Sequence, residues 1–125
     1  PSKDLIEICE KHNIELVSNP SEEVLEALIQ TARIHTFYSG QATGVKLKLI
    51  NSLSSPGHII VNENMISGTN LTEICTLSKD EKEFQNLVQE KLKSELSSAE
   101  FQTRISFLKD NYSTEKNCQT ILNYL

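Results

Sequence analysis

The sequence has no stretch typical of a membrane span or of a signal peptide. No run approaches the roughly 18 consecutive apolar residues that a spanning helix needs. The start, Pro1-Ser2-Lys3-Asp4, lacks the basic residues followed by a continuous apolar core that mark a secretory leader. We therefore expect a cytoplasmic protein. The chain also lacks an initiator Met, which is compatible with a fragment of something longer.

Cysteine is scarce and widely spaced. Cys9, Cys75 and Cys118 are an odd number, with no CxxC pair and no histidine nearby to complete a ligand set. This pattern predicts reduced thiols, as expected in the cytoplasm, rather than disulfides. We expect no metal and no cofactor.

Basic residues are not in excess. The net charge is −5 and the isoelectric point is about 5.2, whereas a nucleic-acid face would need clustered Lys and Arg. The sequence also has no complete Walker or GxGxxG motif. We therefore expect no nucleic-acid partner, and an anionic ligand would have to be held by local geometry.

Strand-like and helix-like segments alternate over residues 1–77. The expected strands are residues 14–20, 34–39, 58–62 and 73–77, and the expected helices follow Ser2, follow Ser21 and cover residues 44–54. We read residues 63–72 as a loop with turn residues. Such alternation indicates parallel pairing of strands through helical crossovers, and hence an α/β sandwich.

From Lys79 onward the pattern is wholly helical. Apolar residues keep helical spacing over residues 84–96, again over 101–108, and again over 118–125 after Ser113 as N-cap. With 125 residues the chain fits one domain. The predicted fold is a Rossmann-like partial domain, with a short parallel sheet of about four strands, flanking helices and three consecutive helices at its end.

The stretch SGQATG, residues 39–44, is the best candidate for a binding site. It follows the second expected strand and precedes a helix, where ligands of open parallel sheets settle. Gly40 and Gly44 permit close backbone approach, and Thr43 can cap the helix or bond a ligand oxygen. The alternative is an ordinary loop between a strand and a helix.

Two lysines open the following helix. On a helical wheel Lys46 falls in the middle of a broad apolar face, whereas Lys48, Asn51 and Ser52 lie opposite. A lysine should not be buried unpaired, so Lys46 either places its ammonium beside a phosphate at the strand ends or extends into solvent. Both interpretations remain open, and Lys48 is more simply explained as solvated.

Other polar residues are weaker candidates. His12, His35 and His58 are scattered, and we expect surface or strand-end positions for them. The turn Ser18-Asn19-Pro20 could meet a base or ribose, or be a plain capped turn. Glu63-Asn64 could reach the candidate binding site at residues 39–44, or be a polar turn. No Ser/His/Asp or Cys/His set can be assembled.

A longer passage resembles a known family. The segment TARIHTFYSGQATGVKLKLINSLSSPGHIIVN, residues 31–62, is similar to the donor-binding domain of GT-B glycosyltransferases of group 1, or family 4, which read like G-x-[RK]-x-K-x-x-E-A and then G-x-P-V-V. The resemblance continues through MISGTNLTEICTLSKDEKEF (65–84) and FQTRISFLKDNYSTEKNCQTIL (101–122). It covers the chain from about Ile14 to Leu125.

The resemblance implies transfer of a sugar, as by a hexosyltransferase, from a nucleotide diphosphate sugar to an acceptor hydroxyl in glycan or cell-surface polysaccharide synthesis. The implied donor-binding residues are Gly40, Gln41, Ala42, Thr43, Gly44, Lys46, Lys48 and Asn51. Ser18, Asn19 and Pro20 would lie near the base. Retaining members carry two glutamates spaced E-x7-E, and the matching positions here are Thr43 and Asn51, which supply no carboxylate.

The resemblance also implies a larger parent protein. Residues 1–125 would be the C-terminal portion of the donor-binding domain, and the isolated segment would be inactive without the N-terminal domain that holds a glycan or lipid-linked acceptor. The parent could work at the inner face of the cell membrane as a peripheral protein. The alternative is a noncatalytic α/β domain that binds a nucleotide or a protein.

In the complete enzyme, Lys46→Ala should weaken donor affinity and slow turnover, because the developing charge on the leaving diphosphate would lose a cation. Steady-state kinetics with the donor measures both quantities. Unchanged affinity and turnover would remove Lys46 from the site.

Overall fold

The centre of the structure is a three-stranded parallel sheet. The computed structural model describes residues 1–42, 47–112 and 122–123. Strands β1 (Ile34–Phe37), β2 (His58–Asn62) and β3 (Thr76–Ser78) pair in the order β1-β2-β3. Ile34 is opposite His58, and Ile60 is opposite Thr76. The predicted α/β class and the parallel pairing are therefore confirmed.

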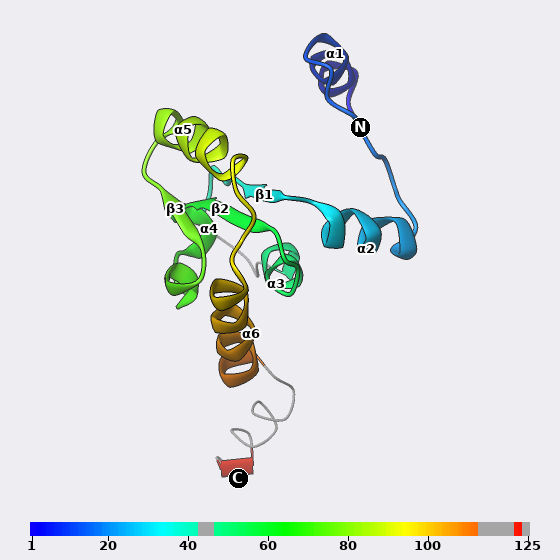
Figure 1. The fold of residues 1–125 in the computed structure, drawn as a ribbon. Helices are drawn as coiled ribbons and strands as arrows, with labels where there is room; N and C mark the ends of the chain where they lie inside the picture. Colours follow the sequence, from blue (N-terminus) through cyan, green and yellow to red (C-terminus); the bar gives the residue numbers. More distant parts are fainter. Residues whose placement is uncertain (43–46, 113–121, 124–125) are drawn as a thin grey trace.

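The two faces of β2 carry different helices. Ile59 and Val61 belong to a buried cluster with residues of α3 (Leu47–Leu53) and α4 (Glu63–Ile66), and α6 (Ser98–Tyr112) packs against the same cluster. Ile60 is equally buried, and its side chain points to the opposite face because side chains alternate along a strand. Helix α5 (Glu81–Lys91) lies on the other side of the sheet from α3 and α6 (Figure 1).

The expected first strand is absent. Residues 14–18 have no strand partner among the described residues and lie between α1 (Lys3–Lys11) and α2 (Glu22–Thr31), apart from the sheet (Figure 1). Ile14 is 56% exposed, and Leu16 and Val17 are also exposed. The prediction of about four strands was wrong, because strand composition produces a strand only where a neighbour supplies the ladder hydrogen bonds.

Two other local predictions differ from the structure. Residues 63–66, expected as a loop, form the short helix α4, which buries Met65 and Ile66. The strand expected over 73–77 exists, but it starts later, as β3 at residues 76–78, because the 3-10 turn η1 (Leu71–Glu73) covers the expected start. Leu71 is fully buried, so packing of this side chain favours the turn over an extended start.

The N-terminal helices follow their capping signals. The hydroxyl oxygens of Ser2 and Ser21 accept hydrogen bonds from the amides of Leu5 and Val24, each at 3.3 Å. Both helices leave apolar side chains exposed, because they lie apart from the sheet (Figure 1); the exposed residues are Leu5, Ile6, Ile8, Val24, Leu25 and Leu28. None of the described helices combines the length and apolarity that a bilayer crossing requires.

Helix α3 is rotated from the expected face. Leu49 and Leu53 are buried as expected, but Leu47 is 64% exposed and Ser52 is buried. The Ser52 hydroxyl donates to the carbonyl of Lys48 at 3.0 Å, so its burial leaves no polar group unsatisfied. The expected start of this helix at residues 44–46 lies outside the described residues.

Two of the three helices predicted at the C-terminal end of the chain are confirmed. Helix α5 starts at the Asp80 cap, whose carboxylate accepts from the Glu83 amide at 2.8 Å, and ends at Lys91. Helix α6 then covers residues 98–112, which is longer than the pattern over 101–108 indicated. The third expected helix, after Ser113, falls mostly outside the described residues.

The turn between α3 and β2 is closely packed. Arg104 of α6 donates through one guanidinium nitrogen to the carbonyls of Ser55 and Gly57, at 3.1 and 2.8 Å. The Ser55 hydroxyl lies 2.9 Å from Nε2 of His35. Burial, and then the positive charge of Arg104, lower the pKa of His35, so its ring stays neutral near pH 7.

Gly57→Ala should destabilise the domain by about 1 to 3 kcal/mol, the usual range for an overpacked core. A Cβ atom at this position would lie 2.5 Å from the Ala32 carbonyl oxygen and 3.0 Å from the His35 ring. Urea denaturation measures the change. Gly40→Ala is the matched control, because a Cβ there meets nothing within 4 Å and should leave stability unchanged or slightly raised. Equal stability of the two variants would contradict this account.

Candidate functional site

The expected binding loop lies at the carboxyl end of β1. Ser39 lies two residues after the end of β1, and Gly40, Gln41 and Ala42 are exposed after it. The other predicted loop and helix residues, Thr43, Gly44 and Lys46, lie outside the described residues. Residues 40–42 of the loop are therefore open to solvent, at the end of the sheet where a ligand of a parallel sheet would bind.

Two asparagines hold this loop. Asn62, the last residue of β2, accepts from the Ser39 amide at 3.1 Å through Oδ1 and donates to the Ser39 carbonyl at 2.8 Å through Nδ2. Asn64 donates to the same carbonyl at 3.0 Å. Both polar groups of the Ser39 backbone are thus satisfied by side chains from the neighbouring strand end, which fixes the direction in which the chain leaves the sheet.

Ser39 also shapes the residues that follow. Its hydroxyl donates to the carbonyl of Gln41 at 2.7 Å and lies 3.2 Å from the Gln41 amide. This side-chain turn folds the backbone of residues 39–41 on itself. A Cβ at Gly40 would meet nothing among the described residues, so this position is open to solvent.

A hollow of about 570 Å³ opens beside the loop. Its walls are Thr36, Phe37, Tyr38, Ser39, Leu47, Lys48, Leu49 and Met65. Lys48 is exposed, as expected, and no carboxylate lies within ion-pair distance of it among the described residues. Its ammonium group is therefore available to an anion in this hollow.

The structure separates Asn51 from Lys48. Asn51 lines a different hollow, between α2 and α3, together with Glu22, Glu23 and Glu26. Three carboxylates make this hollow unfavourable for a phosphate. The turn Ser18-Asn19-Pro20 leads into α2 and borders neither hollow. The structure therefore brings Lys48 to the loop at residues 39–42, but neither Asn51 nor residues 18–20.

The next helix along the sheet offers no second anion site. At the carboxyl end of β3, Asp80 caps α5, and a Glu83 carboxylate oxygen accepts from the Lys79 amide at 2.7 Å. Asp80 thus satisfies the Glu83 amide in the first turn, and Glu83 satisfies the Lys79 amide just before the cap. Two carboxylates therefore already lie at the start of this helix, which makes it less favourable for an anion than the loop after β1.

Sequence reasoning missed the role of two groups of residues. Asn62 was read as part of a strand, although an asparagine at the end of a buried apolar run signals a polar contact at a strand end. The second group lies at the amino ends of the strands and contains Arg104 and His58. His58 is at a strand end, one of its two expected positions, but it is only 4% exposed, and its Nε2 lies 2.8 Å from the Ser94 carbonyl. A single arginine in a helical pattern gave no signal.

By fold the chain is a small α/β domain, with a three-stranded parallel sheet packed against helices. No family model, curated protein or solved structure matches it. No group of three His, Cys, Asp or Glu side chains that could hold a metal ion is found in residues 1–42, 47–112 and 122–123. The candidate site therefore rests on its own geometry.

Asn62→Ala should loosen the loop, because the Ser39 amide loses its acceptor and the carbonyl loses one of its two donors. We expect hydrogen exchange at the Ser39 amide to accelerate about tenfold, which corresponds to about 1.4 kcal/mol, the scale of one or two lost hydrogen bonds. Asn86→Ala, at an exposed position on α5, is the control. Unchanged Ser39 protection would show that Asn62 does not hold the loop.

Proposed function

We propose that the chain is the C-terminal part of the Rossmann-like donor-binding domain of a GT-B glycosyltransferase. In this proposal the nucleotide diphosphate of the donor lies at the carboxyl end of β1. The observation that carries it is the loop at residues 39–42, held by Asn62 and Asn64 beside a hollow into which Lys48 brings an unpaired charge. Carboxyl ends of parallel strands are the usual ligand edge of such sheets.

The loop at residues 39–42 and Lys48 together form what we call the donor corner, and the chemistry required of it is modest. When a sugar leaves a nucleotide diphosphate, negative charge develops on the phosphate oxygens, and fixed amides and lysines stabilise it without a metal. Lys48 would meet one phosphate, and backbone amides near Gln41 would meet another. Lys46, Thr43 and Gly44 belong to the same proposal on the resemblance alone. Asn51, which the resemblance assigns to the donor, gains no support, because it lines a different hollow from Lys48.

A noncatalytic binding domain is the second candidate. It is favoured by the absence of carboxylates at Thr43 and Asn51, where retaining glycosyltransferases of this group carry glutamates. The two candidates share the donor corner and differ in whether the parent protein transfers a sugar. An N-terminal half of similar α/β design in the parent sequence would support the transferase, and its absence would exclude it.

Calorimetric titration of the chain with UDP and with GDP tests nucleotide binding at the donor corner. One of the two should bind, and Lys48→Ala should weaken its affinity about five- to tenfold, because an exposed lysine that meets a phosphate contributes about 1 kcal/mol. Lys11→Ala, on α1, is the control for loss of one positive charge and should bind as tightly as the wild type.

Equal affinity of the Lys48→Ala and wild-type chains would place the nucleotide elsewhere. Transfer of labelled sugar by the complete parent protein then separates the two candidates. Nucleotide binding that depends on Lys48, without any transfer, would establish the noncatalytic domain.

A further inference from the structure

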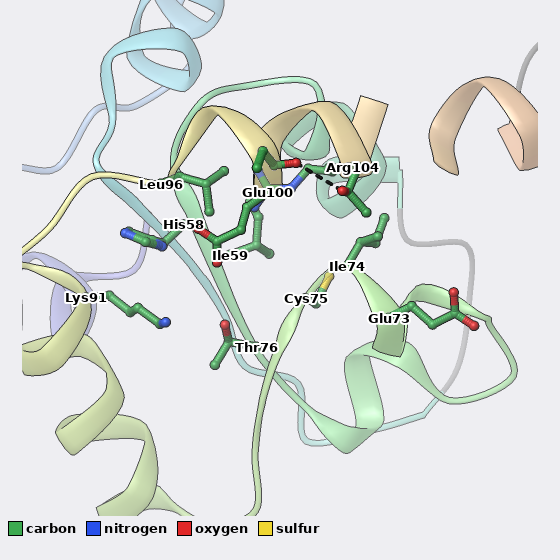
Figure 2. Close-up of a pocket in the computed structure, with 12 residues that line it drawn as sticks. His58, Ile59, Glu73, Ile74, Cys75, Thr76, Lys91, Leu96, Glu100 and Arg104 are labelled. Carbon is green, nitrogen blue, oxygen red and sulfur yellow. Dashed lines mark hydrogen bonds between the residues drawn. The ribbon is translucent and has the colours of Figure 1, made fainter. Parts of the chain in front are cut away.

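A third hollow lies at the opposite end of the sheet from the proposed donor corner. It has a volume of about 360 Å³ and is bounded by the amino ends of β2 and β3, the last turn of α5 and the first half of α6. Figure 2 shows its principal polar side chains, His58, Cys75, Thr76, Lys91, Glu100 and Arg104. This volume lies within the usual range for small-molecule sites.

Arg104 is the central feature of this hollow. Its residue is only 4% exposed, and one guanidinium nitrogen makes both of its hydrogen bonds, to Ser55 and Gly57. In the described part of the chain, the other N–H groups of Arg104 have no hydrogen-bond partner. No fully buried side-chain nitrogen or oxygen lacks a partner there, so these N–H groups must be reached by solvent. Since Arg104 lines the hollow, these free N–H groups open onto it.

No carboxylate lies within ion-pair distance of this guanidinium in the described part of the chain, although the charge of Glu100 acts on it from farther away. Within residues 1–42, 47–112 and 122–123 the only ion pair joins Arg33 and Glu95. Glu100, one helical turn before Arg104, is instead held by Ser97, whose amide and hydroxyl donate to Oε2 at 3.1 and 2.7 Å. A buried arginine without a carboxylate partner is costly, and a bound anion would remove that cost.

The rest of the hollow supports a binding role. Lys91 points its ammonium toward the same space, and the Thr76 hydroxyl is directed into it (Figure 2). Glu73 turns its carboxylate away, toward the outside (Figure 2). The lining therefore holds two cations, Arg104 and Lys91, and two carboxylates, of which Glu73 points away from the hollow and Glu100 is hydrogen-bonded by Ser97.

Cys75 does not act as a nucleophile here. Burial raises the pKa of its thiol to about 11, so the thiol stays protonated at neutral pH, and the weaker opposing effect of Arg104 does not reverse this. The hollow thus has a cationic anchor and hydrogen-bonding groups but no activated attacking group. Its chemistry is recognition.

We propose that this hollow binds the oxyanion group, carboxylate or phosphate, of a small molecule. The free N–H groups of Arg104 grip the oxyanion from the closed end, the Thr76 hydroxyl donates to it, and Lys91 completes the contact at the mouth. The guanidinium fork suits two oxygens of one oxyanion. The proposal is independent of the donor corner, because the two hollows share no residue and lie at opposite ends of parallel strands.

Nuclear magnetic resonance titration of the full chain with inorganic phosphate, and separately with succinate, tests the proposal. At least one of the two should give saturable shifts at the Arg104 Nε–H resonance and at the Thr76 amide. Thr76→Val keeps the shape of the side chain, and Lys91→Ala removes the charge at the mouth; each should weaken binding about three- to tenfold.

Lys93→Ala is the matched control. Lys93 is an exposed lysine two residues beyond Lys91. This change should not alter the titration. Loss of affinity in Lys93→Ala equal to that in Lys91→Ala would reveal general charge screening and overturn the proposal, as would the absence of saturable shifts with both probes. The Thr76→Val and Lys91→Ala variants leave the Arg104 contacts to Ser55 and Gly57 intact, so binding is tested in a folded chain.

Discussion

The contact of Arg104 with the turn before β2 is the interaction on which much of the structure depends. One nitrogen binds the carbonyls of both Ser55 and Gly57. The contact fixes where β2 begins and holds α6 against the sheet. It also keeps Gly57 close to Ala32, where no side chain fits. Because the turn needs only one nitrogen of the guanidinium, the others remain free to face the neighbouring hollow.

The two ends of the sheet differ in chemistry because all three strands run in the same direction. At the carboxyl end the chain leaves through loops, and neutral amides of Asn62 and Asn64 hold the loop after β1. Lys48, an exposed cation, lines the hollow beside that loop. At the amino end the strands start from packed turns, and the charge of Arg104 is buried. An anion at the carboxyl end would be bound weakly and close to solvent, whereas one at the amino end would meet a desolvated cation.

Elements with local signals were predictable from the sequence. Ser2 and Ser21 cap helices that begin where expected, and the apolar run at 58–62 is a buried strand. Residues 14–18 have equally good strand composition but lack a neighbouring strand, so they stay unpaired. For the site, the loop after β1 and the solvated state of Lys48 were predictable from position. The Asn62 clamp joins residues 23 apart in sequence, and the Arg104 contacts join residues 47 and 49 apart, which no local pattern reports.

The sequence by itself determined the α/β class, the caps of the first two helices and the loop that follows β1, because each depends on residues close together in the chain. The tertiary structure decided which strand-like segments pair, which face of α3 is buried and which polar groups meet at each end of the sheet. The physical reason is that burial and hydrogen-bond satisfaction depend on neighbours in space. Ser52 can be buried because its hydroxyl bonds to a carbonyl, and Leu47 is exposed because none of the described elements covers it.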